Sequence, residues 1–189
     1  MTAALVASLA PLISRVRTDV TARKSDDGRQ SWSREALTEK RLLAHVLGGT
    51  ARGVSQIQAG ESTTRVAVLD FDSHGGTQDD VDWEAMSAVV LRVVDVLELG
   101  WGLRATLWRS SGGRGVHAYY LWDEPQDAYS VREVLRRGLE ACGLKSGAGG
   151  VSQGAVEIFP KQNEVSADGY GNQVIVPLSG KSVPLETVA

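Results

Sequence analysis

The chain has 189 residues, of which 42% are hydrophobic and 23% charged, and its formal net charge at pH 7 is −3. This composition is typical of one ordinary globular domain and excludes the overall basic character of many nucleic-acid-binding proteins. No apolar run approaches the ~20 residues of a membrane span, and no basic residue precedes Arg15, so we expect neither a membrane segment nor a signal peptide. The single cysteine, Cys142, excludes an intramolecular disulfide, indicates core packing on a helix and favours an intracellular location.

Charge is unevenly distributed along the chain. Residues 104–116 contain three arginines and no acid, whereas residues 77–99 contain six acids and one arginine. A locally basic stretch on an acidic protein is compatible with a phosphate-bearing partner, although it does not identify one.

The N-terminal part, about residues 1–50, is predicted to be mainly helical. Ser33 is a suitable N-cap for its second helix, and Gly48-Gly49 is a suitable end. The predicted order is a helix over residues 3–20 interrupted by Pro11, a loop over 23–33, a helix over 34–47, a strand over 53–59 and a turn at 60–62.

Strand and helix patterns alternate in the remainder of the chain. The predicted strands are runs rich in β-branched residues, and the predicted helices have apolar residues three and four positions apart. Asp79 or Asp80 is expected to cap the first of these helices, and Gly100 to end it. The order is a strand over 66–72, a helix over about 80–100, strands over 104–109 and 116–122, a helix from Asp127, and strands over 155–159 and 172–178.

Residues 66–159 therefore have the order β-α-β-β-α-β, the split βαβ arrangement of ferredoxin-like domains. Right-handed crossovers would place both helices on one face of the sheet, with the first strand between the third and the fourth. We therefore predict an α+β fold, in which a single domain over residues 1–189 has its core at about 53–180.

Three acidic residues fall on the predicted strands. Asp70 and Asp72 share one face of their strand, with Cα atoms roughly 6.6 Å apart. Glu157, the only charged residue between 147 and 160, lies on the neighbouring strand. Carboxylates without a thiolate prefer Mg²⁺ or Mn²⁺ to zinc, and this set can bind one ion or a metal pair. The alternative is a strand end whose acids simply face water.

A glycine-rich turn precedes the one histidine of the predicted sheet. Residues 110–115, Ser-Ser-Gly-Gly-Arg-Gly, allow close approach of the backbone to a ligand, and His117 follows on the next strand. Backbone N–H groups, the Arg114 guanidinium and the His117 ring together suit phosphate oxygens. The turn is not a Walker A loop, because neither a Lys-Ser/Thr pair nor a helix follows it. The alternatives are an ordinary hairpin turn and a structural histidine.

Three further polar residues flank these segments. Lys161 and Gln162 follow the strand of Glu157 and are placed to contact a phosphate or a base, although Lys161 is equally typical of a solvated surface. His74 is a candidate extra ligand beside Asp72, but a loop histidine is more often incidental.

These motifs have a family resemblance. Asp70-Phe71-Asp72 resembles the first motif of the archaeo-eukaryotic primase superfamily, and residues 109–117 resemble its second. Residues 157–163, Glu-Ile-Phe-Pro-Lys-Gln-Asn, with the strand over 171–178, resemble the third motif and the strand after it. The likeness is greatest to primase domains of phage replication proteins and mobile-element conflict systems. Fainter matches run through residues 17–19 and 45–49.

The resemblance implies an RNA-recognition-motif-like catalytic core with an N-terminal helical extension. It implies that Asp70, Asp72 and Glu157 are catalytic and bind two Mg²⁺ or Mn²⁺ ions, although many members carry Asp where Glu157 stands. Larger relatives append further parts, so the chain would be a minimal core or a piece of a longer protein. The nucleotide-binding residues it implies are Ser111, Gly112, Gly113, Arg114, Gly115, His117, Lys161 and Asn172.

The activity implied is that of a DNA primase or polymerase that uses nucleoside triphosphates on a single-stranded DNA template. A replicative helicase is a candidate partner, and a cytoplasmic protein encoded by a phage or plasmid is the expected setting. Three alternatives remain open: a repair polymerase that only extends primers, a metal-dependent nuclease, and a non-enzymatic module that binds single strands through aromatic residues such as Trp108 and Tyr119.

Overall fold

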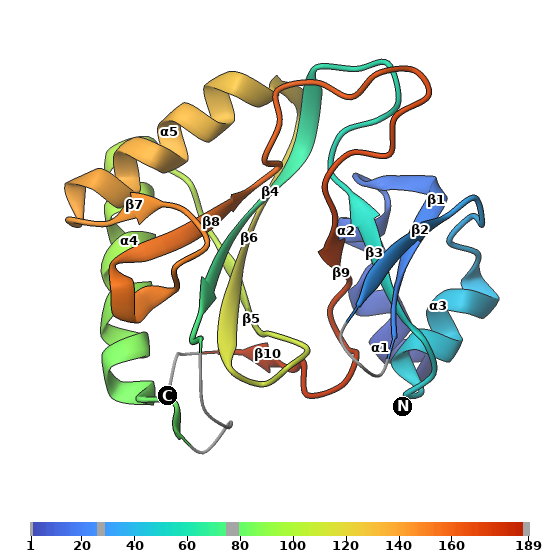
Figure 1. Cartoon of the computed structure of the whole chain (residues 1–189), viewed down its shortest axis with the longest axis horizontal. Coiled ribbons are helices and arrows are strands. Elements are labelled where there is room, and N and C mark those ends of the chain that lie inside the picture. The colour runs from blue at the N-terminus through green and yellow to red at the C-terminus, as the bar shows by residue number, and fades with distance from the viewer. Residues whose placement is uncertain (1, 26–28, 75–79, 187–189) are drawn as a thin grey trace.

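Two β-sheets face each other in the computed structural model, which describes residues 2–25, 29–74 and 80–186 (Figure 1). The sheets have the strand orders β2-β1-β3-β9 and β10-β5-β6-β4-β8-β7. The helices are α1 (Thr2–Ser8), α2 (Ala10–Ile13), α3 (Glu39–Val46), α4 (Trp83–Trp101) and α5 (Ala128–Ala141), with a 3-10 turn at Val151–Gln153. The strands are β1 (Arg17–Lys24), β2 (Gln30–Ser33), β3 (Ala51–Ser55), β4 (Thr63–Asp72), β5 (Thr106–Arg109), β6 (Gly115–Asp127), β7 (Lys145–Ser146), β8 (Ala155–Phe159), β9 (Val174–Ile175) and β10 (Pro184–Leu185).

The six-stranded sheet contains the predicted β-α-β-β-α-β unit. Strand β4 lies between β6 and β8 and pairs antiparallel with both, as the sequence predicted. Helices α4 and α5 cover one face of this sheet, on the left of Figure 1. The added edge strands β7 and β10, each two residues long, were not predicted.

Strand β4 is buried on both faces, and the two faces have different roles. Leu69 and Phe71 pack against the helices, in one core with Leu97 of α4 and Leu139 of α5. Val66 and Val68 face the opposite way and join a second core with residues of the four-stranded sheet. Since Asp70 has the same parity as Val68, the strand directs its carboxylate into the space between the two sheets.

The ends of the two long helices differ in part from the prediction. Asp82, rather than Asp79 or Asp80, caps α4, because its Oδ1 accepts a hydrogen bond from the N–H of Ala85 at 2.9 Å; Asp79 lies outside the described residues. The helix continues past Gly100 and ends at Trp101. Gly102 is its C-terminal cap and has the left-handed φ, 68°, that is typical of this position. Asp127 caps α5 as predicted, with its Oδ1 accepting from the N–H of Ser130 at 2.8 Å.

The prediction of a mainly helical N-terminal part was wrong between residues 17 and 33. Strand β1 replaces the end of the predicted helix and the first two residues of the predicted loop, and β2 replaces the last four residues of that loop. The cause is tertiary, because β1 pairs with both β2 and β3 and thereby gains hydrogen bonds that its local sequence does not reveal. Helix α3 is also shorter than predicted and begins after Thr38, whose hydroxyl caps it, rather than after Ser33.

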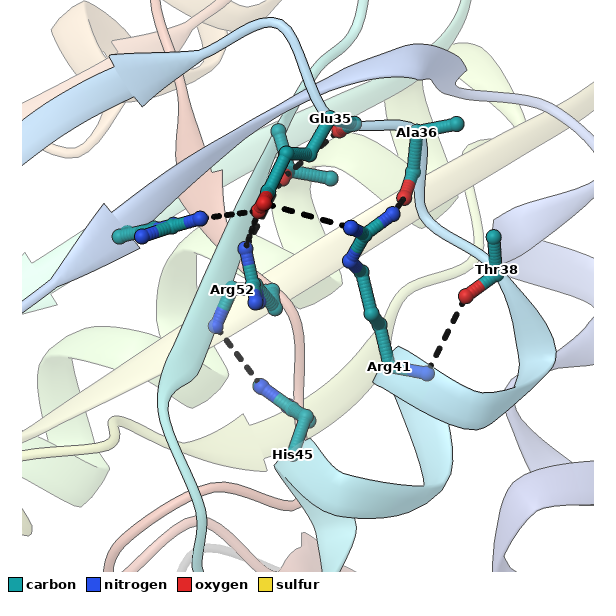
Figure 2. Close-up of polar contacts among 8 residues, drawn as sticks. Glu35, Ala36, Thr38, Arg41, His45 and Arg52 are labelled. Carbon is teal, nitrogen blue, oxygen red and sulfur yellow. Dashed lines mark hydrogen bonds and ion pairs between the residues drawn. The ribbon is translucent and has the colours of Figure 1, made fainter.

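A carboxylate with three arginines fixes the connection between β2 and α3. Glu35 contacts the guanidinium groups of Arg23, Arg41 and Arg52, the last two at 3.3 and 3.2 Å. Figure 2 shows the contacts with Arg41 and Arg52. Hydrogen bonds from Arg23 and Arg52 lower the pKa of Glu35 to about 2. The carboxylate is therefore ionised at neutral pH.

A buried histidine fixes α3 against β3. His45 is fully buried, and its Nδ1 accepts the N–H of Arg52 at 2.9 Å (Figure 2). Its Nε2 lies 2.9 Å from the carbonyl of Pro177. Since Nδ1 is the acceptor, Nε2 is the nitrogen that donates.

The last predicted strand is shorter than expected and belongs to the other sheet. Only Val174–Ile175 of residues 172–178 forms a strand, and it pairs with β3 rather than with the six-stranded sheet.

Cys142 is buried in the core beside α5, as predicted. Among the helices of the described residues, none is long and apolar enough to cross a membrane.

Candidate active site

A cavity of about 580 Å³ lies between the two sheets. The six-stranded sheet and its loops contribute Asp70, Asp72, Ser73, His74, Ser110, Ser111, Gly112, Arg114, His117, Glu157, Phe159 and Lys161. The four-stranded sheet and the segment before β9 contribute Lys24, Gln30, Trp32, Gly171, Asn172, Gln173, Val174 and Ile175. All three predicted carboxylates therefore border one space, together with His117.

Strand register brings the predicted residues together. Asp70 pairs with His117 on β6 and with Glu157 on β8, so the three residues form one row across neighbouring strands. Asp72 lies two residues further along β4, on the same face. The sequence predicted that these three strands are neighbours, and the register places the three residues opposite one another.

Each carboxylate has a side-chain nitrogen of a histidine or lysine beside it. Nε2 of His117 lies 3.3 Å from Oδ1 of Asp70, Nδ1 of His74 lies 3.6 Å from Oδ2 of Asp72, and Nζ of Lys161 lies 2.8 Å from Oε2 of Glu157. The Lys161 side chain therefore reaches the site while 43% of it stays exposed to solvent.

Burial and mutual charge set the protonation of the pair at the centre. Burial raises the pKa of Asp70, but the positive charge of His117 outweighs it and holds that pKa below its usual value. Burial lowers the pKa of His117, but the Asp70 carboxylate outweighs it and raises that pKa. Burial, followed by repulsion from Asp70, raises the pKa of Asp72. The charged form is therefore favoured at Asp70 and at His117 and disfavoured at Asp72.

The donor set fits a hard divalent cation. With the side chains as they stand, no three metal-binding groups among residues 2–25, 29–74 and 80–186 are close enough to hold an ion. Oδ1 of Asp70 is nevertheless buried and accepts no hydrogen bond from the described residues. Oxygen donors on paired strands, one of them a buried oxygen that has only the ion-pair contact with His117, are suited to Mg²⁺ or Mn²⁺.

The glycine-rich turn is pressed against the end of β4. Within it, the N–H of Gly113 donates to the carbonyl of Ser110 at 2.9 Å, and Gly113 has a φ of 75° that favours glycine. A Cβ on Gly115 would lie 2.3 Å from the carbonyl oxygen of Phe71, so no larger residue fits there. The turn is therefore fixed beside Asp72.

The predicted nucleotide-binding residues divide into two groups. Gly113 and Gly115 do not line the cavity, and their contribution is the shape of the turn. The N–H of Asn172 donates to Oε1 of Gln162 at 2.9 Å, which ties the two loops together. The residues that border the cavity are Ser111, Gly112, Arg114, His117, Lys161 and Asn172.

The sequence did not identify the residues contributed by the other sheet. Lys24 is the most prominent of them, since its Nζ lies 3.3 Å from Oγ of Ser111. Lys24 and Trp32 were assigned to a loop, and only the recognition of β1 and β2 as a hairpin would have placed them here. His74, judged incidental, also borders the cavity.

The fainter sequence matches lie outside the cavity and have structural contacts. Arg17 forms a two-pronged ion pair with Asp19, at 2.7 and 2.9 Å, and donates to the carbonyl of Gly169 at 2.6 Å. That ion pair lowers the pKa of Asp19. His45 likewise joins α3, β3 and the segment after β9.

Comparisons with solved structures show the fold. The polymerase domain of Mycobacterium tuberculosis ligase D, in complex with DNA, superposes with a TM-score of 0.53 at 17% identity, covering 94% of this chain and 75% of that one. The primase-polymerase domain of cyanophage S-2L matches with a TM-score of 0.42 at 17% identity, covering 85% and 90%. No curated protein matches the chain.

The family follows from a comparison with family models. The model of the archaeo-eukaryotic primase domain of TOTE conflict systems matches residues 12–187. That match includes both sheets and every residue of the cavity. The chain therefore belongs to the archaeo-eukaryotic primase domain family of TOTE conflict systems, and its α+β architecture is the archaeo-eukaryotic primase fold.

Proposed function

We propose that this chain is a nucleotidyltransferase that extends or makes primers on a single-stranded DNA template from nucleoside triphosphates. One observation carries the proposal: a single cavity contains a row of carboxylates beside a tight turn with cations around it. Carboxylates alone would repel a triphosphate, and cations alone would not activate a hydroxyl. The two sets together suit a metal-bound triphosphate.

Each set has a distinct task in the proposed reaction. Mg²⁺ or Mn²⁺ bound by Asp70, Asp72 and Glu157 would lower the pKa of the primer 3′-hydroxyl and neutralise the leaving pyrophosphate. Lys24, Ser111 and Arg114 would bind the phosphate oxygens and hold the triphosphate in line. The 3′-oxygen attacks the α-phosphorus, its proton leaves to solvent, and the bond to pyrophosphate breaks.

His117 would take a positioning role between the two sets. Its ring contacts Asp70 and borders the same cavity as Arg114, so it orients the carboxylate and adds positive charge for the triphosphate. The pKa of this histidine is raised, which favours the charged form that both tasks need. Residues 1–189 would act as one catalytic domain, since both sheets contribute to the cavity.

Single-stranded DNA is the template we propose. The ligase D polymerase domain that shares this fold was solved in complex with DNA. Of the three arginines in the basic stretch at residues 104–116, Arg114 borders the cavity.

The test is primer extension with Mn²⁺ or Mg²⁺, comparing the wild type with Asp70→Asn and Asp72→Asn. Each substitution keeps the shape of the side chain but removes a charged metal ligand, so we expect at least a hundredfold loss of rate with an unchanged circular dichroism spectrum. Asp95→Asn is the matched control, because Asp95 is exposed on α4 and outside the cavity. Extension at the wild-type rate by folded Asp70→Asn would refute the assignment.

An unprimed template separates the two forms of the proposal. A primase will form dinucleotides and longer products from nucleoside triphosphates on single-stranded DNA alone, whereas a repair-type polymerase will require an annealed primer. Degradation of a labelled strand without nucleotides, dependent on Asp70, would instead identify a nuclease.

A further inference from the structure

The four-stranded sheet directs an aromatic ring into the cavity, opposite the carboxylates. Trp32 on β2 pairs with Ala22 of β1, and Gln30 pairs with Lys24, so these side chains share one face of the hairpin. Trp32, Gln30 and Lys24 all border the cavity. The reaction proposed above assigns a task to Lys24 but none to the tryptophan.

A second ring supports the tryptophan from behind. Tyr170 is stacked on Trp32 with ring centroids 5.4 Å apart and planes inclined by 15°. Tyr170 does not border the cavity, whereas Trp32 does, so the tyrosine covers a part of the indole that lies away from the site. The tyrosine is itself fixed, because Nε of Arg34 donates to its hydroxyl at 3.1 Å.

The strand that carries this ring is tied to the segment before β9 by a second contact. Nε2 of Gln173 donates to Oε1 of Gln30 at 2.7 Å, two residues from Trp32 along β2. Tyr170 therefore contacts the ring itself, and the amide pair ties down the strand that carries it. A tryptophan fixed in this way loses little conformational freedom when a ligand stacks on it.

We propose that Trp32, supported by Tyr170, is the stacking platform for a nucleobase in this cavity. The inference rests on the proposed function and extends it to the part of the substrate that the carboxylates and the turn leave unbound. A nucleotide with bound metal ions presents phosphates, the metal ions and a base, and the cavity offers cations for the phosphates, carboxylates for the metal ions and an aromatic face for the base. Stacking on an indole accepts any base, because every base has a π face.

The experiment compares two ligands that differ only by the presence of a nucleoside. Dissociation constants for dATP and for inorganic tripolyphosphate, both with Mg²⁺, are measured for the wild type and for Trp32→Ala and Trp32→Phe. We expect Trp32→Ala to weaken dATP binding about tenfold and to leave tripolyphosphate binding unchanged. Trp32→Phe should retain most of the dATP affinity, because it keeps a ring at this position.

The matched control is Trp101→Ala. Trp101 is an exposed tryptophan at the end of α4, outside the cavity, so its loss should change neither dissociation constant. A circular dichroism spectrum of Trp32→Ala that matches the wild type shows that the hairpin is still folded.

A third ligand distinguishes an incoming nucleotide from the template as the source of the base. Weaker binding of a short single-stranded deoxyadenosine oligonucleotide by Trp32→Ala, with dATP unaffected, would assign the platform to a template base. The proposal would be overturned if Trp32→Ala weakened the binding of dATP and of tripolyphosphate equally. It would also be overturned if Trp32→Ala left the binding of both dATP and the oligonucleotide unchanged. A wild type that binds neither dATP nor tripolyphosphate would refute the proposed function, and the oligonucleotide would still test the platform.

Discussion

His45 shows how one buried side chain makes the stability of this fold depend on pH. Burial is the main reason that the pKa of His45 is lowered, and the charge of Arg52 adds to it. Protonation would also place a hydrogen on Nδ1, which faces the N–H of Arg52 and accepts from it. The folded state therefore favours the neutral imidazole of His45 over the protonated one.

The first prediction at this scale concerns acid. A folded-state pKa below the unfolded value of about 6.5 means that the stabilisation is complete above that value and is lost as the pH falls below it. We expect His45→Gln to cost about 1–3 kcal/mol of unfolding free energy at pH 7.5 through lost hydrogen bonds. The difference from the wild type should shrink at pH 5.5, as urea unfolding would measure, and a constant difference would contradict a neutral histidine.

The helices α4 and α5 show at the scale of elements how closely the fold is packed. A Cβ on Gly138 of α5 would lie 2.4 Å from Cδ2 of Leu97 on α4, whose side chain is fully buried. A Cβ on Gly100, within α4, would meet nothing within 4 Å. Both glycines are helical, so alanine gains the same helix propensity at each position. Because only Gly138 lacks space for a Cβ, the substitution should have opposite effects at the two positions.

The second prediction is therefore a matched pair of alanine substitutions. Gly100→Ala should raise the unfolding free energy by up to about 1 kcal/mol, because alanine favours a helix. Gly138→Ala gains the same propensity but overpacks the interface with Leu97, so we expect a net loss of roughly 1–2 kcal/mol. Thermal or urea unfolding of the two variants tests this, and equal shifts would show that the helices separate easily.

Elements of the catalytic unit could be predicted because each has a local signal. Strand β4 has a strongly β-branched run, and α5 has both a capping aspartate and a regular apolar stripe. The order of these elements along the chain placed the strand of Asp70 between the strand of His117 and the strand of Glu157. The hairpin of β1 and β2 has no comparable signal, because its polar residues are stabilised by the partner strand β3 and by Glu35. Lys24 and Trp32 were missed for that reason.

At the scale of the molecule, the site exists only where the two sheets meet. One apolar core contains Val68 and Phe159 from the six-stranded sheet together with Val54 and Val174 from the other. A buried hydrogen bond, 3.2 Å long, also joins the Tyr119 hydroxyl to the carbonyl of Ile175. Because the sheets share a core, each sheet needs the other to bury the apolar face that lies between them.

The last prediction follows from this shared core: the chain should unfold in one cooperative transition. Val54 belongs to the core between the sheets, and Val156 to the core beneath α4 and α5. Val54→Ala and Val156→Ala should each cost roughly 2 kcal/mol and shift the whole urea transition without changing its m-value. If the four-stranded sheet were an independent unit, Val54→Ala would instead produce an early transition of partial amplitude. A single shifted transition in both variants would mean that the two sides of the cavity unfold together. These sides are the four-stranded sheet with Trp32 and the six-stranded sheet with the carboxylates.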